Sequence, residues 1–249
     1  LVYGDVNSTL AAALVCSKLN IRLAHVEAGL RSFDRTMPEE INRIVTDQLA
    51  DVLFTPSEDG DINLQREGIP KERILRVGNV MIDSLVRLLP AARQCAKNDL
   101  PERYVLVTLH RPSNVDDGAS LRRILTALLE INDVLPVVFP AHPRTRQRVE
   151  QFGIGTGKLH FVEPLPYVEF LSLQRNATVV ITDSGGIQEE TTYLGIPCLT
   201  LRSNTERPVT VSIGTNVLVG QDPRLLNSEL TRILEGKGKK GSIPPLWDG

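Results

Sequence analysis

The sequence of 249 residues lacks the marks of several protein classes. Its three cysteines, Cys16, Cys95 and Cys198, are odd in number and far apart, so neither a disulfide framework nor a zinc site with paired spacing is expected. No apolar run approaches the roughly 18 residues that cross a bilayer, and no basic segment leads into an apolar signal core. These absences favour a protein of the reducing cytoplasm with no membrane partner.

An excess of charge of one sign is also lacking. The chain has 28 Lys and Arg against 30 Asp and Glu, and its pI is near 6.1. Nucleic acids and anionic membranes select surfaces rich in Lys and Arg, so no nucleic-acid partner is expected. With 41% hydrophobic residues the chain can bury one large core or two smaller ones. The chain has no initiator Met and begins within an apparent strand, so we expect an N-terminal truncation.

Short β-branched runs alternate with amphipathic stretches from end to end. This pattern is typical of parallel sheets with crossover helices, so the predicted fold class is α/β. A polar stretch that ends in Pro101 follows a helix rich in Ala and Arg, and it places the predicted domain boundary between residues 92 and 93. The predicted strands are 1–3, 22–27, 52–56, 74–77, 104–108, 137–140, 159–162, 178–182, 198–201 and 217–219.

The segment 182–190, Thr-Asp-Ser-Gly-Gly-Ile-Gln-Glu-Glu, directly follows an apolar strand. Its glycine turn and helix start expose backbone amides at the positive end of a helix, which favours a phosphate. Ser184 either caps this helix or binds a ligand oxygen, and Glu190, about one turn later, can accept hydrogen bonds from a ribose diol. The segment therefore predicts a diphosphate cradle, with a plain capped helix as the simpler alternative.

Other polar residues lie where predicted strands end or helices begin. Arg207 can supply the charge that a diphosphate needs. Asp5 is either a helix cap or a carboxylate directed at the crevice where open α/β sheets bind ligands. His25 and Glu27 are expected on one side of a strand. Glu39 begins a helix, where the helix dipole alone favours acidic residues.

His110 follows the strand predicted at 104–108, which places a titratable imidazole at that strand's carboxyl edge. Three carboxylates and one histidine that face one crevice form a coherent set for proton transfer, although each has an ordinary structural explanation. The glycines at 153–157 precede a strand rather than a helix and predict a turn. His142 either contacts a ligand or has a structural role, and a structural role is expected for His160 inside a strand. No metal-ligand spacing is present.

Taken in order, these motifs resemble a known family, the non-hydrolysing UDP-N-acetylglucosamine 2-epimerases. The resemblance implies a GT-B fold, with the active site in the cleft between two Rossmann-like domains. Residues 1–92 would be the C-terminal portion of the first domain, and 93–249 the UDP-binding domain. The matching blocks are Gly4-Asp5, His-Val-Glu-Ala-Gly-Leu-Arg at 25–31, Pro-Glu-Glu-x-Asn-Arg at 38–43, Gly78-Asn79, His110-Arg111, the segment 182–190 and Thr-Glu-Arg-Pro at 205–208.

The activity that the resemblance implies is reversible inversion at C2 between UDP-GlcNAc and UDP-ManNAc. UDP is eliminated to leave 2-acetamidoglucal and is then added back on the other face, without a cofactor or a metal. Such an enzyme is cytoplasmic, usually homodimeric, and serves cell-envelope polysaccharide synthesis. By motif position, the acid and base carboxylates would be Asp5, Glu27 and Glu39, with His110 beside the phosphate and the sugar. The UDP ligands would be Phe170 at the uracil, Ser184, Gly185 and Gly186 at the diphosphate, Glu190 at the ribose and Arg207 at the phosphates.

Departures from the family pattern leave other functions open. The family's N-terminal Gly-Thr-Arg-Pro-Glu-type loop is absent, and Arg-Pro-Ser-Asn at 111–114 stands where Arg-Arg-Glu-Asn is common. A related UDP-2-acetamido sugar is an alternative substrate. A GT-B glycosyltransferase would use the same ligands for the nucleotide. A hydrolytic relative would release free UDP and N-acetylmannosamine, and a binding module would bind without exchange of the C2 hydrogen.

Overall fold

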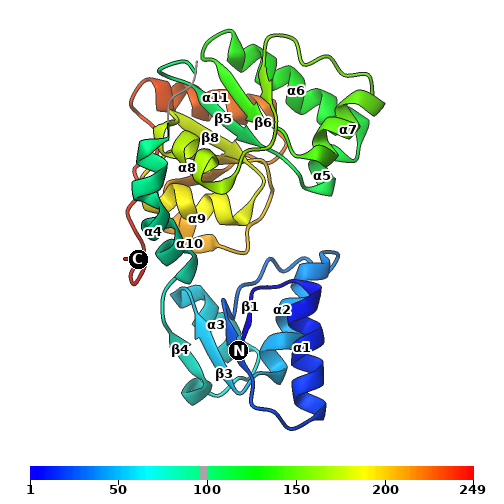
Figure 1. Ribbon diagram of the computed structural model, residues 1–249, viewed down its shortest axis with the longest axis vertical. Helices are drawn as coiled ribbons and strands as arrows, with labels where there is room; N and C mark the ends of the chain where they lie inside the picture. Colours follow the sequence, from blue (N-terminus) through cyan, green and yellow to red (C-terminus); the bar gives the residue numbers. More distant parts are fainter. Residues whose placement is uncertain (96–99) are drawn as a thin grey trace. The chain divides into compact units, whose positions relative to one another are not determined.

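The computed structural model describes residues 1–95 and 100–249, and within them strands and helices alternate along the chain (Figure 1). All strand pairs are parallel, as predicted, and the strands form two sheets. The chain divides into two compact units. Unit 1 comprises residues 1–84, 205–212 and 244–249, and unit 2 comprises 85–204 and 213–243. None of the helices in these described ranges combines the length and apolar character needed to cross a membrane.

Unit 1 is built on a four-stranded sheet with the strand order β1-β2-β3-β4. Ala13, Leu23, Leu53 and Leu64 are buried in its core. Trp247 is 1% exposed, and its indole nitrogen donates a hydrogen bond to the carbonyl oxygen of Pro56 over 2.9 Å. This buried indole docks the end of the described chain on unit 1. The elements are β1 (Val2–Tyr3), α1 (Asn7–Lys18), β2 (Ala24–Val26), α2 (Pro38–Leu49), β3 (Val52–Thr55), α3 (Glu58–Arg66), the 3₁₀ helix η1 (Lys71–Arg73), β4 (Ile74–Arg76) and α10 (Pro208–Ser212).

Unit 2 is built on a six-stranded sheet with the strand order β10-β9-β8-β5-β6-β7. The chain crosses from β7 to β8, so the order reverses beside β5, and open α/β sheets bind ligands at such a point. The elements are β5 (Val105–Thr108), α5 (Pro112–Val115), α6 (Gly118–Asn132), β6 (Val137–Pro140), α7 (Pro143–Gln151), β7 (His160–Val162), α8 (Tyr167–Asn176), β8 (Val179–Thr182), α9 (Gly185–Leu194), β9 (Cys198–Thr200), β10 (Asn216–Leu218) and α11 (Pro223–Leu234).

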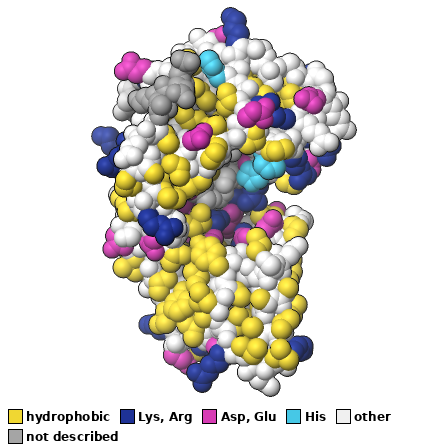
Figure 2. Space-filling view, viewed as in Figure 1, with side chains coloured by type: hydrophobic (Ala, Val, Ile, Leu, Met, Phe, Trp, Pro, Cys, Tyr) yellow, Lys and Arg dark blue, Asp and Glu magenta, His cyan; other side chains and the backbone are white. Residues whose placement is uncertain are grey.

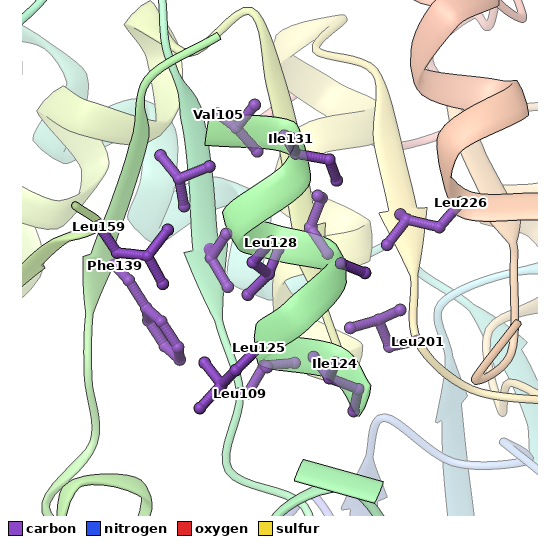
Figure 3. Close-up of a cluster of buried hydrophobic side chains, with 14 of the residues drawn as sticks. Val105, Leu109, Ile124, Leu125, Leu128, Ile131, Phe139, Leu159, Leu201 and Leu226 are labelled. Atoms are coloured by element: carbon purple, nitrogen blue, oxygen red, sulfur yellow. The ribbon is translucent and has the colours of Figure 1, made fainter. Parts of the chain in front are cut away.

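The largest core of unit 2 lies between α6 and the sheet. Figure 3 shows Ile124, Leu125, Leu128 and Ile131 along one side of α6, close to side chains of the neighbouring strands. Successive members of this set are one, three and three residues apart, so they form a single apolar stripe along the helix. The sheet covers this stripe. This core fixes the positions at which the strands end, and therefore the loops that follow them.

The predicted domain boundary falls within α4 (Val80–Gln94), whereas the two compact units divide between Ser84 and Leu85. The polar stretch 97–99, on which the predicted boundary partly depended, lies outside the described residues. The assignment of residues 1–92 and 93–249 to two domains therefore stays a prediction.

One local prediction was wrong. The strand expected at 22–27 ends at Val26, because Glu27 has a φ of +71° and leaves the extended conformation. His25 and Glu27 therefore do not share a side through strand alternation. A left-handed φ is costly for a residue with a side chain and persists only where the surroundings enforce it, commonly at functional sites.

Gly29, two residues after Glu27, is a glycine that the fold requires. Its φ is +82°, and a Cβ atom would lie 2.5 Å from the carbonyl oxygen of Gly60. We expect Gly29→Ala to lower the free energy of unfolding by about 3 kcal/mol or more, because a left-handed backbone costs roughly 1–2 kcal/mol and the clash adds to it. Gly68→Ala is the matched control, since Gly68 has a φ of +85° with nothing within 4 Å. Urea denaturation that shows equal losses for the two variants would contradict this expectation.

Candidate active site

Asp5 lies in the turn between β1 and α1, where its carboxylate is bound by an arginine. Arg43, from α2, approaches Asp5 Oδ2 with Nε at 3.0 Å and Nη2 at 2.7 Å. Asn42 donates a hydrogen bond to the main-chain carbonyl of Asp5 over 2.8 Å. Val6, not Asp5, occupies the cap position of α1 and makes no side-chain capping bond. Asp5 is therefore not the cap of α1, and Arg43 holds its carboxylate; the predicted orientation toward a crevice stays a prediction.

Glu27 follows β2 and pairs with Arg207. Arg207 Nη2 lies 2.7 Å from Glu27 Oε1, and the two side chains are only 9% and 10% exposed. Burial raises the pKa of Glu27, Arg207 lowers it, Asp5 raises it, and Arg43 and His25 lower it. The net result is a pKa above the ordinary value of 4.5, because desolvation outweighs the arginines. A carboxylate with a raised pKa is suited to take up and release a proton near neutral pH.

Glu39 and Glu40 begin α2, but they lie in different surroundings. Glu39 is half-buried in the first turn, after Pro38 at the first helical position. Glu40 is 1% exposed and accepts hydrogen bonds from the amides of Ser32 and Phe33. Its Oε2 also lies 2.7 Å from Arg43 Nη1. Glu40 therefore anchors the loop before α2, a role that the sequence did not indicate.

His110 follows β5 in unit 2, as predicted, and is bound by Asp183. His110 Nδ1 lies 3.0 Å from Asp183 Oδ1, and the imidazole is 43% exposed whereas the carboxylate is fully buried. The amides of His110 and Arg111 and the side chain of Asn114 also donate to Asp183. Burial raises the pKa of Asp183, but His110, Asn114 and the Arg111 amide outweigh it and leave the pKa below the ordinary value. Asp183 thus fixes the loop after β5 as a charged group.

His142 lies near His110, with ring centroids 6.3 Å apart. It occupies the cap position of α7, where Nδ1 accepts a hydrogen bond from the Arg144 amide. This contact gives His142 a structural role, and the alternative contact with a ligand stays a prediction.

The segment 182–190 forms the predicted strand, turn and helix, with Gly185 and Gly186 in the first turn of α9. Ser184 occupies the cap position, and its hydroxyl makes no capping hydrogen bond. The Ser184 amide donates to the hydroxyl oxygen of Thr182 over 3.0 Å. The helix start therefore presents amides and a hydroxyl suited to an anion.

Glu190, on α9, is 4% exposed. The hydroxyl of Tyr167 donates to its Oε1 over 2.8 Å, while Oε2 is buried without a hydrogen-bond partner among the described residues. Burial raises the pKa of Glu190, and the neighbouring hydroxyl of Tyr167 and side-chain amide of Gln174 offset this only in part. A buried acceptor of this kind is suited to a ligand hydroxyl. Tyr167 belongs to none of the motifs found in the sequence.

Phe170, on α8, is partly buried and packs against a core cluster that includes Tyr104, Leu106 and Val180. This packing is an ordinary structural role, and the predicted contact with uracil stays a prediction. Within the described ranges, no three His, Cys, Asp or Glu side chains are grouped so that they could hold a metal ion.

Two comparisons relate this chain to known proteins. The family model described as UDP-N-acetylglucosamine 2-epimerase matches residues 1–249. The UDP-N-acetylglucosamine 2-epimerase of Methanocaldococcus jannaschii is 44% identical over 253 residues, which cover 95% of this chain and 68% of that protein. The UDP-2,3-diacetamido-2,3-dideoxy-D-glucuronate 2-epimerase of Pseudomonas aeruginosa is 46% identical over 223 residues, covering 88% of this chain and 63% of that protein.

Solved structures give the same result. The crystal structure of the Methanocaldococcus jannaschii enzyme in complex with UDP-GlcNAc and UDP has a TM-score of 0.90 at 43% identity, covering 97% of this chain and 70% of that one. The Neisseria meningitidis enzyme bound to UDP-GlcNAc has a TM-score of 0.89 at 32% identity, covering 99% and 71%. These matches confirm the predicted fold class of two parallel-sheet α/β domains of the GT-B kind. The chain belongs to the UDP-N-acetylglucosamine 2-epimerase family.

Proposed function

We propose that the protein is an isomerase that interconverts UDP-N-acetylglucosamine and UDP-N-acetylmannosamine by reversible epimerisation at C2. One observation carries the proposal within a chain of this family: the loops after the neighbouring parallel strands β1 and β2 each present a carboxylate paired with an arginine. Such pairs allow proton transfer to carbon beside charge that stabilises an anion.

The proposed chemistry has two halves. A carboxylate removes the C2 proton while the bond between C1 and the diphosphate oxygen breaks, so UDP leaves with the bonding electrons and a C1–C2 double bond forms in 2-acetamidoglucal. Re-addition of UDP at C1 with protonation at C2 from the other face gives the epimer. Asp5, Glu27 and Glu39 are the proposed acid and base groups, and His110 the proposed contact to the phosphate and sugar. No oxidant, reductant, cofactor or metal is needed.

The residues proposed to bind UDP are those that match the family motif and whose chemical groups suit a diphosphate, a uracil or a ribose. Ser184, Gly185 and Gly186 are the proposed ligands of the diphosphate, because the start of α9 presents amides and a hydroxyl without a capping bond. Arg207 is proposed to contribute charge to the phosphates, and Phe170 to contact uracil. Glu190 is the proposed ligand of the ribose, supported by its buried acceptor oxygen.

We expect Glu190→Gln to weaken UDP binding by about 10- to 100-fold, since hydrogen bonds to charged groups contribute roughly 1.5–3 kcal/mol. Isothermal titration with UDP measures this loss. Glu169→Gln, an exposed substitution in the first turn of α8, is the control and should leave affinity unchanged. An unchanged affinity in Glu190→Gln would exclude Glu190 as the ribose ligand.

Proton NMR of the protein with UDP-GlcNAc in deuterated water tests the activity. Deuterium at C2 together with the appearance of UDP-ManNAc is the expected result. Tight binding without C2 exchange would overturn the proposal, free N-acetylmannosamine would indicate a hydrolase, and turnover that requires an added acceptor would indicate a transferase. The UDP-2,3-diacetamido glucuronate named for the Pseudomonas relative is the comparison substrate, because a faster reaction with it would reassign the sugar.

A homodimer is also proposed, because unit 1 exposes large apolar side chains. Leu14, Val15, Leu19 and Ile21, on and after α1, are 45–64% exposed. Figure 2 shows hydrophobic side chains gathered over α1 and around β4. Clusters of this kind commonly mark interfaces. Light scattering should give twice the monomer mass for the protein and a smaller mass for Val15→Glu, and a monomer in both would contradict the proposal.

We further propose a cytoplasmic enzyme that supplies cell-envelope polysaccharide synthesis. All three cysteines are free, which is consistent with a reducing compartment. Fractionation of cells that produce the protein, with C2 exchange as the assay, tests the location.

A further inference from the structure

The buried face of α2 is polar throughout. Glu40, Asn42, Arg43, Thr46 and Asp47 are each 5% exposed or less. A surface helix of a globular domain ordinarily buries an apolar stripe, because polar side chains are costly to bury unless they are hydrogen-bonded. Arg43 and Asn42 bind Asp5, as described above, and Asp47 binds a second set.

Asp47 connects three groups at the centre of unit 1. Its Oδ1 lies 2.6 Å from Nδ1 of His25, and both side chains are fully buried. Its Oδ2 accepts a hydrogen bond from the Gly29 amide over 3.1 Å and lies 2.8 Å from Nη2 of Arg31. The other ring nitrogen of His25, Nε2, lies 2.9 Å from the carbonyl oxygen of Gly4. The two side chains thus hold the main chain at Gly4 and at Gly29.

These two anchor points flank the carboxylates of the site. Gly4 immediately precedes Asp5, and Gly29 is two residues after Glu27. Glu27 has a left-handed φ of +71°, which only contacts from the surroundings can maintain. One carboxylate on α2 and one imidazole on β2 therefore fix both loops at once.

The hydrogen bonds also define the charge of His25. A carbonyl oxygen only accepts, so Nε2 carries a hydrogen. The Asp47 carboxylate already receives donors from Gly29 and Arg31, and a carboxylate oxygen also only accepts, so Nδ1 carries a hydrogen as well. His25 is therefore an imidazolium ion. Burial lowers the pKa of His25, but the hydrogen bond and charge of Asp47, the Gly4 carbonyl and Glu27 outweigh it and leave the pKa above 6.5.

We propose that Asp47 and His25 are positioning residues for the epimerisation: together they hold the loops of Asp5 and Glu27 in the arrangement that proton transfer at C2 needs. Neither residue touches the substrate. The inference rests on the proposed function and adds two residues to it. Misplacement of a catalytic group by about 1 Å can cost about 100-fold in rate. The contacts at Gly4 and Gly29 should therefore affect the rate, although they do not involve the carboxylates themselves.

Two substitutions at Asp47 separate this role from a general loss of stability. Asp47→Ala removes all the bonds of the carboxylate. Asp47→Asn can keep them: its amide oxygen accepts from Gly29 and Arg31, and its NH₂ group donates to Nδ1 of a neutral His25, which still donates to Gly4. We expect kcat for conversion of UDP-GlcNAc to fall about 100-fold in Asp47→Ala. The UDP dissociation constant should change less than about twofold, and Asp47→Asn should recover most of the lost rate, because its hydrogen bonds return.

The pH profile gives a second readout that a merely structural role would not change. In Asp47→Asn, His25 becomes neutral, so Glu27 loses one of the charges that lower its pKa. Arg207, Asp5 and Arg43, the other charged groups that act on Glu27, are unchanged. The acid limb of kcat/KM should therefore move to higher pH. Glu67→Gln is the structural control, because Glu67 binds the side chain of Arg31 over 2.6 Å rather than the main chain at Gly4 or Gly29. It should lower the melting temperature without a change in kcat.

The wild-type protein is measured first, in deuterated water. Absence of C2 exchange there overturns the proposed function itself. If the wild-type protein exchanges, an unchanged kcat in Asp47→Ala overturns the positioning role alone, as does a loss of kcat in Glu67→Gln as large as that in Asp47→Ala. Should Asp47→Ala fail to fold, Asp47→Asn decides the question: an upward shift of the acid limb supports the role, and a wild-type pH profile overturns it.

Discussion

Replacing Glu27 by Gln is expected to reduce C2 hydrogen exchange by about 10²- to 10⁴-fold, the usual contribution of a general base. Glutamine keeps the size of the side chain and can still accept a hydrogen bond from Arg207, but it cannot take up a proton. UDP binding should persist, since the proposed ligands of the uridine lie in unit 2. Proton NMR of the C2 position measures the exchange, and titration with UDP measures the binding.

The direction of the pH dependence follows from the surroundings of Glu27. Its pKa lies above 4.5 because burial outweighs the neighbouring arginines. Only the ionised carboxylate acts as a base, so kcat/KM of the wild-type protein should fall as the pH drops through the pKa of Glu27. Because this pKa is raised, the fall should occur at a higher pH than for an ordinary carboxylate. In Glu27→Gln, the residual activity should lack this limb.

Two further variants make the test specific. Glu72→Gln changes an exposed carboxylate of η1 and should exchange at the wild-type rate. Asp5→Asn removes the other paired carboxylate of the same sheet edge. If Asp5→Asn abolished exchange while Glu27→Gln retained it, the base would be Asp5, and the role proposed for Glu27 would be wrong.

The architecture was predictable from the sequence because its signals are local. Short β-branched runs such as Val105 to Thr108 and Val179 to Thr182 form strands wherever a sheet buries both of their faces, and the turn residues between them set the boundaries. The same holds for the segment 182–190, whose glycines and position after a strand indicate the helix start that the structure contains.

The pairing of the site residues was not predictable, because it depends on contacts between distant segments. Arg207 and Glu27 are 180 residues apart, and nothing local to either identifies the other as its partner. A signal for the network on α2 did exist: Glu40, Arg43 and Asp47 share one face of a helix at intervals of three and four residues. A charged stripe ordinarily faces solvent, and only the structure shows that this one is buried.

Substitution of Arg207 by Gln is expected to reduce kcat/KM by about 100-fold or more, the magnitude seen when one donor to a developing anion is removed. Two effects combine. A phosphate loses its proposed cation, and Glu27 loses the group that most strongly lowers its pKa. The pKa of Glu27 therefore rises further, and the acid limb of kcat/KM should move to higher pH than in the wild-type protein.

The same substitution should make stability depend on pH. Removal of one partner from a buried ion pair costs roughly 3–5 kcal/mol when the other charge stays uncompensated. Glu27 can avoid that cost by binding a proton, and its folded-state pKa then lies above its unfolded value. The stabilisation from this proton is complete below the unfolded pKa and is lost as the pH rises through the folded pKa. Arg207→Gln should therefore be nearly as stable as the wild-type protein in acid, and less stable once the pH has risen through the raised folded-state pKa of Glu27.

Urea denaturation at a series of pH values measures this difference. Arg232→Gln, which breaks the exposed pair with Glu229 on α11, is the control and should change stability little at any pH. A loss of stability in Arg207→Gln that is the same at every pH, with an unshifted acid limb, would show that Arg207 does not control the protonation of Glu27. A loss that grows with pH, together with weaker binding of UDP-GlcNAc, would show that one guanidinium acts on both the base and the substrate. Binding of the diphosphate to Arg207 would then weaken the ion pair between Arg207 and Glu27. The pKa of Glu27 would rise, and its carboxylate would become more basic when the substrate binds.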